Sequence, residues 1–124
     1  MECSILKLII EKGPKAGEIL EYASGSVVKI GRLVRGNTIG IKDAGISSKH
    51  ISIAFDNQVS KWNLTDLDSS NGTILNGTLL KSNVPSTLED GDCIKIGELT
   101  SIIVNIELQS TITRSGHSGS CCCC

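Results

Sequence analysis

The sequence is poor in aromatic residues. Tyr22, Phe55 and Trp62 are the only Tyr, Phe and Trp side chains, 2% of the 124 residues. Single-stranded nucleic acids are bound largely by stacking their bases on aromatic side chains, so this class of function is disfavoured. A core, if one forms, has to be built from Ile, Leu and Val.

An excess of either charge is also missing. Lys and Arg number 12, Asp and Glu number 13, and the formal net charge is −1. General binders of nucleic acid usually present a basic face and a high isoelectric point. We therefore expect no direct nucleic-acid binding, and a near-neutral chain fits a single concentrated anion site better.

No apolar run approaches the ~18 residues that span a bilayer, and the N-terminus lacks the pattern of a secretory signal. We therefore expect an intracellular protein, nuclear or cytoplasmic, with reduced thiols and no membrane partner. The consecutive Cys121–Cys124 lack the spacing of zinc-binding cysteine pairs. We expect no metal and no cofactor.

Helical periodicity is absent, and short alternating segments are separated by turn signals instead. Ile51 to Phe55 alternates well, and Asn76-Gly77 is the strongest short signal for a β-hairpin. About ten or eleven such segments indicate an all-β sandwich. After Leu108 the composition shifts to Ser, Thr, Gly and Cys, which predicts one domain over 1–108 and a disordered tail over 109–124.

Three polar motifs stand where predicted strands end: Gly31-Arg32, Ser47-Ser48-Lys49-His50, and Ser69-Ser70-Asn71-Gly72-Thr73. An Arg side chain offers a rigid fork of N–H donors that fits phosphate oxygens. Serine hydroxyls and loop N–H groups complete the shell around such an anion. Because no nucleophile–base pair is evident, the motifs predict a site that holds a phosphate rather than an enzyme that cleaves one.

The order and spacing of these motifs resemble the forkhead-associated (FHA) domain. The resemblance rests on Gly31-Arg32, the S-x-x-H of Ser47 to His50, Ser70-Asn71-Gly72 and Asn76-Gly77, and it covers about Ile5 to Leu108. It implies an eleven-stranded antiparallel β-sandwich whose loops at one end bind phosphothreonine peptides. The implied partner is a phosphothreonine-containing protein or peptide, bound by a monomer, and the family favours the nucleus.

The resemblance also assigns roles to five residues that would contact the peptide. Arg32 would bind the phosphate, and Ser47 would donate its hydroxyl to a phosphate oxygen. Ser48 would add a contact from the same loop, and Ser70 would lie beside the phosphothreonine. Asn71 would hydrogen-bond the peptide backbone just after the phosphothreonine.

Four further residues would be structural: Gly31, His50, Gly72 and Asn76. Family members often select the residue three positions after the phosphothreonine through the loop before the S-x-x-H motif. Because that loop has no basic side chain at Gly45, an acidic preference is not expected there, and an apolar preference is a hypothesis.

Two other functions are left open by the sequence. Lipidation of Cys121–Cys124 would make the protein a membrane-tethered adaptor, since two acyl chains suffice for stable anchoring. The last four residues nevertheless lack the aliphatic positions of a C-a-a-X prenylation signal. A phosphate-independent interaction domain is the other alternative.

Overall fold

The computed structural model describes residues 2–110, and in that part of the chain every regular element is a strand. Eleven strands follow one another in the order β1 (Glu2–Lys12), β2 (Ile19–Ala23), β3 (Val27–Arg32), β4 (Ile39–Ile41), β5 (Ile51–Asp56), β6 (Lys61–Asp66), β7 (Thr73–Leu75), β8 (Thr78–Leu79), β9 (Ser86–Thr87), β10 (Cys93–Ile96) and β11 (Thr100–Ser110). The all-β class expected from the sequence is confirmed.

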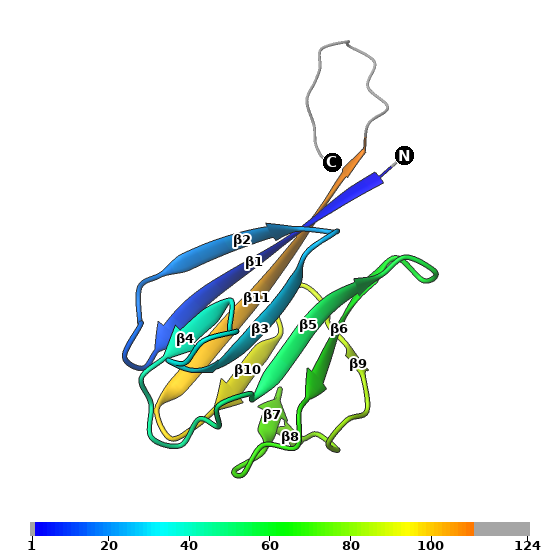
Figure 1. Cartoon of the computed structure of the whole chain (residues 1–124). Helices are drawn as coiled ribbons and strands as arrows, with labels where there is room; N and C mark the ends of the chain where they lie inside the picture. The colour runs from blue at the N-terminus through cyan, green and yellow to red at the C-terminus, as the bar shows by residue number, and fades with distance from the viewer. Residues whose placement is uncertain (1, 111–124) are drawn as a thin grey trace.

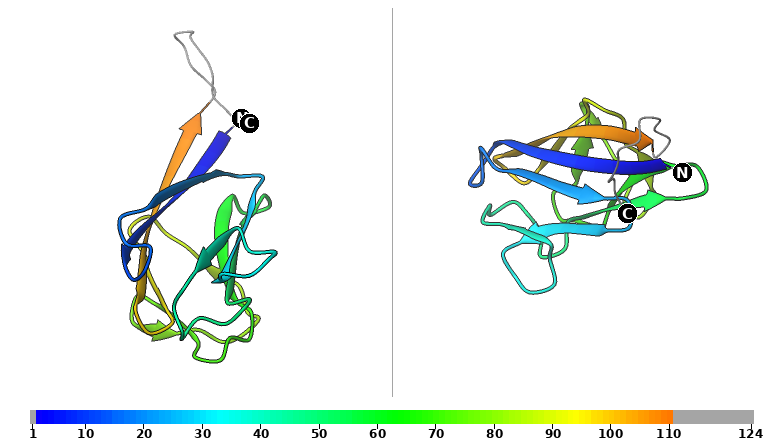
Figure 2. Two further views of the ribbon diagram at one scale, coloured as in Figure 1. Left: turned by 60° about the vertical axis from the view of Figure 1, so that its left-hand side comes forward. Right: turned by 90° about the horizontal axis from the view of Figure 1, so that it is seen from above.

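The strands form two sheets that face each other (Figure 1). One sheet has the order β2-β1-β11-β10-β7-β8 and the other the order β4-β3-β5-β6-β9. The first and last strands, blue and orange in Figure 2, lie side by side in one layer. The paired strands are antiparallel except for β3 and β4, which run parallel with Ile30 opposite Ile39.

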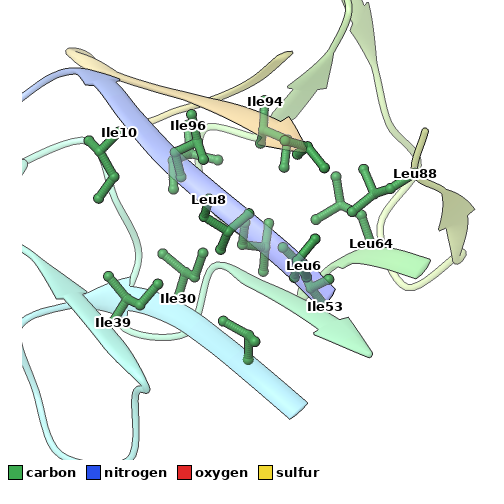
Figure 3. Close-up of a cluster of buried hydrophobic side chains, with 14 of the residues drawn as sticks. Leu6, Leu8, Ile10, Ile30, Ile39, Ile53, Leu64, Leu88, Ile94 and Ile96 are labelled. Carbon is green, nitrogen blue, oxygen red and sulfur yellow. The ribbon is translucent and has the colours of Figure 1, made fainter. Parts of the chain in front are cut away.

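The core lies between the sheets and consists almost entirely of Ile, Leu and Val (Figure 3). Apolar residues at alternate positions of a strand form this core, since every second residue of a strand points to the same face. Leu6, Leu8 and Ile10 of β1 thus face the opposite sheet. Trp62 is the one aromatic side chain fully buried there, and its indole N–H donates to the Ser4 hydroxyl at 2.9 Å.

Strand β11 continues to Ser110, two residues beyond the expected domain boundary at Leu108. It stays paired with β1 to its end, where Glu2 lies opposite Ser110. The rest of the expected tail, including Cys121–Cys124, lies outside the described residues. Within the described part of the chain, no helix is long and apolar enough to cross a membrane.

Four loops meet at one end of the sandwich, at the bottom of Figure 1. They comprise residues 33–38, 42–50, 67–72 and 97–99. Hydrogen bonds join them, among them Asn37 Nδ2 to Ser48 O, Ser70 N to Ser47 Oγ, and Glu98 N to Asp43 Oδ1. The chain therefore brings three of its polar motifs together at one edge of the fold.

A hollow of about 270 Å³ lies at the opposite end, near the start of β1 and the end of β11. Its walls include Ser4, Lys61, Leu88 and Ile106. It contains none of the polar motif residues, so we place the candidate site in the four loops.

Candidate functional site

Arg32 is the last residue of β3, and its side chain is exposed at the loop end. Its Nε–H donates to the carbonyl of Ile46 at 3.1 Å, and its backbone N–H donates to the carbonyl of Ser47 at 2.9 Å. A guanidinium carries five N–H donors. The bond to Ile46 therefore fixes the side chain while the four N–H groups of its two terminal nitrogens remain for a ligand.

Ser47 sits in the next loop and contacts the third one. Its Oγ accepts a hydrogen bond from the backbone N–H of Ser70 at 2.9 Å. A hydroxyl has one donor and two acceptor positions. Since the bond to Ser70 occupies an acceptor position, the hydroxyl proton of Ser47 remains available for an anion.

His50 is fully buried between the two loops. Its Nδ1 accepts from the backbone N–H of Ser47 at 3.0 Å, and its Nε2 lies 2.9 Å from the carbonyl oxygen of Gly72. An N–H can only donate and a carbonyl can only accept, so the neighbours require the neutral ring with its proton on Nε2. Both nitrogens are thereby occupied, and His50 cannot act as a base toward the Ser47 hydroxyl.

Gly31 is buried directly below the loop that carries Ser48. A Cβ at this position would clash with the Ser48 carbonyl oxygen and lie 2.8 Å from Asn37 Nδ2. Asn37, which the sequence reasoning missed, donates from Nδ2 to the carbonyls of Arg32 at 2.8 Å and Ser48 at 2.7 Å. Ser48 is itself exposed, and its backbone is thus tied to the end of β3.

Asn71 is exposed in the 67–72 loop, and its Nδ2 donates to the carbonyl of Gly45 at 2.9 Å. This bond uses one N–H of the carboxamide and leaves the second N–H and the acceptor positions of Oδ1. Gly72 follows with φ +82°, a conformation in which side chains are strained. The turn at Gly72 therefore supports the placement of Asn71 above the 42–50 loop.

Asp66, a second residue that the sequence reasoning missed, is buried beneath the 67–72 loop. Its carboxylate accepts from the N–H and hydroxyl of Ser69 at 3.1 and 2.5 Å, and from the hydroxyls of Thr73 at 2.6 Å and Ser82 at 3.0 Å. Burial acts to raise the pKa of Asp66, but these hydrogen bonds outweigh it and hold the pKa below its ordinary value.

Asp43 is buried in the same way under the 42–50 loop. Its carboxylate accepts from the backbone N–H groups of Gly45, Glu98 and Leu99 at 2.9, 3.1 and 2.9 Å, and from the Thr100 hydroxyl at 2.9 Å. Burial acts to raise the pKa of Asp43, but these bonds outweigh it and lower the pKa from 3.8 to about 2. The sequence carried no sign that Asp43 joins two loops.

Asn76 does not lie among the other predicted residues. It occupies the two-residue turn between β7 and β8 with φ 51°, and Gly77 beside it has φ 85°. Its side chain bonds Asp92 Oδ1 and the backbone N–H of Cys93, both at 2.9 Å. The structure thus brings Gly31, Arg32, Ser47, Ser48, His50, Ser70, Asn71 and Gly72 together and leaves Asn76 in a separate hairpin.

The assembled site offers an exposed guanidinium, hydroxyls and a carboxamide on a rigid base of hydrogen-bonded loops. Its one imidazole is fully occupied. Within residues 2–110 no group of three His, Cys, Asp or Glu side chains could hold a metal ion. The exposed guanidinium and the hydroxyl donors suit the binding of an anion such as a phosphate.

The sequence is similar to those of known proteins. A family model described as FHA domain matches residues 28–97. The "FHA domain-containing protein At4g14490" of Arabidopsis thaliana is 52% identical over 116 residues, which cover 90% of this chain but 30% of that protein. The chain therefore spans less than a third of that relative's length.

Solved structures show the same arrangement of strands. The "kinase-interacting FHA domain of kinase associated protein phosphatase" from Arabidopsis has a TM-score of 0.79 at 31% identity, covering 89% of this chain and 99% of that one. An FHA domain from a "structural and functional analysis of phosphothreonine-dependent FHA domain interactions" has a TM-score of 0.67 at 29% identity, covering 82% of this chain and 95% of that one.

Proposed function

Because the chain belongs to the FHA domain family, we propose that it recognises phosphothreonine on a partner protein through the loops at one end of its sandwich. It would act as a binding module in phosphorylation-dependent protein–protein interaction. The names of two relatives support this proposal, since one is a kinase-interacting domain and the other belongs to a study of phosphothreonine-dependent interactions.

The observation that carries the proposal is the spare donor capacity of Arg32, Ser47 and Asn71. Each makes one side-chain hydrogen bond inside the domain, to Ile46, Ser70 and Gly45 respectively. Each retains at least one further donor, and these bonds order the side chains before any ligand arrives. Preorganised donors lose little conformational entropy on binding, which favours affinity for a phosphate.

In the proposed complex Arg32 binds two phosphate oxygens through its terminal nitrogens, and Ser47 donates its hydroxyl to a phosphate oxygen. Ser48 and Ser70 lie on the loops beside the phosphothreonine, and Asn71 bonds the peptide backbone. Hydrogen bonds to charged groups contribute ~1.5–3 kcal/mol each. A few of them, less the cost of ordering the peptide, give affinities of about a micromolar.

The test is a titration of the chain with a phosphothreonine peptide library, followed by backbone amide NMR. Shifts centred on Arg32, Ser47 and Asn71, seen with the phosphorylated library and not with its unphosphorylated counterpart, would support the proposal. Replacing phosphothreonine by phosphoserine should weaken binding. Identical responses to both libraries would favour a phosphate-independent interaction domain instead.

A further inference from the structure

Glu98, in the turn between β10 and β11, lies against the loop that carries Ser47. A Cβ added at Gly45 would be 2.7 Å from the backbone nitrogen of Glu98 and 2.8 Å from its Cγ. Only a residue without a side chain allows the two loops to approach this closely. The stem of the Glu98 side chain therefore occupies the space above Gly45.

The same position adjoins Asn71, since its carboxamide donates to the carbonyl of Gly45 at 2.9 Å. The carbonyl of Gly45 thus accepts a hydrogen bond from Asn71, the proposed peptide-binding residue, and Glu98 packs against the α-carbon of Gly45. Because both residues border Gly45, a peptide bonded to Asn71 would run beside the turn that carries Glu98.

Asp43 fixes Glu98 in this place. One oxygen of the buried carboxylate accepts from the N–H groups of both Gly45 and Glu98, and the other accepts from Leu99 and Thr100. The 42–50 loop and the turn at Glu98 are therefore held as one unit. The backbone that carries the Glu98 side chain is thus held in a fixed place beside the 42–50 loop.

The exposed charges in and beside the four loops are of both signs. The exposed cations are Arg35, Lys42 and Lys49, in addition to Arg32 at the end of β3, whereas the exposed carboxylates are those of Asp68 and Glu98. No ion pair involves Glu98 among the described residues. Glu98 therefore contributes a negative charge beside Gly45 that no ion pair within the described residues neutralises, in loops whose other exposed charges are mostly positive.

We propose that Glu98 is a specificity-determining residue that selects a Lys or Arg side chain in the phosphorylated peptide, on the side that crosses Asn71. This inference rests on the proposed function. Gly45 lies two positions before Ser47, with Ile46 between them, and an extended peptide advances about 3.3 Å per residue. The selected position therefore lies roughly two to four residues after the phosphothreonine. A basic preference there would replace the apolar preference hypothesised from the sequence.

The test measures binding of the whole chain to synthetic phosphothreonine peptides by fluorescence polarisation. Lys, Ala or Glu is placed in turn at each of the four positions on either side of the phosphothreonine. At one position Lys should bind about two- to five-fold tighter than Ala, the range of an exposed ion pair, and Glu should bind more weakly. Glu98→Gln should remove this preference, and Glu98→Lys should reverse it.

Two control variants should keep the wild-type preference. Asp68→Asn removes the other exposed carboxylate of these loops, and Glu89→Gln removes one near the opposite end, where Glu89 pairs with Lys61 at 3.8 Å. A Lys preference that survives Glu98→Lys, or that disappears in Asp68→Asn, would overturn the assignment to Glu98. Equal binding of the Lys, Ala and Glu peptides would overturn the inference alone, whereas failure of every phosphorylated peptide to bind would overturn the proposed function with it.

Discussion

The backbone N–H of Ser70 donates to the Oγ of Ser47 at 2.9 Å, across 23 residues of sequence. The bond joins the 42–50 and 67–72 loops at the centre of the site. It also limits what the Ser47 hydroxyl can do, because an oxygen that accepts from Ser70 has its own proton left to donate. One contact thus sets both the spacing of the loops and the orientation of a proposed phosphate donor.

Ser47→Ala should therefore weaken phosphopeptide binding by about ten-fold or more, the value of one hydrogen bond to a charged group. It should also shift the amide resonance of Ser70 in the free protein, because that N–H loses its acceptor. Calorimetry and NMR measure the two effects. Ser48→Ala is the matched control for the free protein, since Asn37 holds the carbonyl of Ser48 rather than its hydroxyl. Unchanged affinity of Ser47→Ala would contradict the role assigned to its hydroxyl.

Arg32→Ala should abolish detectable binding of phosphothreonine peptides while changing the free energy of unfolding by no more than about 1 kcal/mol. The side chain is exposed and makes one hydrogen bond, to Ile46, and surface substitutions of this kind cost little. Urea unfolding measures the stability, and calorimetry measures the binding. Arg35→Ala removes an exposed cation from the loop that follows β3 and should retain binding. A large loss of stability in Arg32→Ala would mean that Arg32 is structural.

The fold was largely predictable, because the alternation of apolar and polar residues in segments such as Ile51–Asp56 indicates which face of the strand is buried. The turn at Asn76-Gly77 was predictable for a local reason as well, since both residues need positive φ. The parallel pairing of β4 with β3 was not predictable. Strand β4 has only three residues, Ile39–Ile41, and so short a segment does not indicate which strand it pairs with.

The site was predictable only in part. Its exposed members, such as Arg32 and Asn71, belong to motifs whose order carries the family resemblance. Asp43 and Asp66, which hold the loops in place, were missed because an Asp beside loop residues is typical of an exposed turn. Hydrogen-bond donors from segments distant in the sequence stabilise these buried carboxylates. The sequence does not show which segments come together, so these donors could not be predicted from it.

His50→Ala should destabilise the domain by about 3 kcal/mol or more and weaken peptide binding as well. The substitution leaves a cavity and removes the partners of the Ser47 N–H and the Gly72 carbonyl, and each unpaired buried group costs ~1–3 kcal/mol. Urea denaturation measures the loss. The neighbouring exposed Lys49 supplies the control, since Lys49→Ala should unfold at nearly the wild-type concentration. Wild-type stability in His50→Ala would show that the two loops do not depend on the imidazole.

Asp43 makes the stability of the domain depend on pH. Its pKa is about 2 in the folded chain against an ordinary 3.8, so its stabilisation is complete above about pH 4 and is lost as the pH falls toward 2. The shift corresponds to about 2 kcal/mol. Asp43→Asn should therefore be less stable than the wild type at pH 7, and the difference should shrink by that amount near pH 2. Urea unfolding of both proteins from pH 7 to pH 2 measures this difference in stability. The contribution of Asp66 to the pH dependence is the same in both proteins and drops out of the difference. A difference that stays constant with pH would show that the four donors around Asp43 do not favour its ionised form.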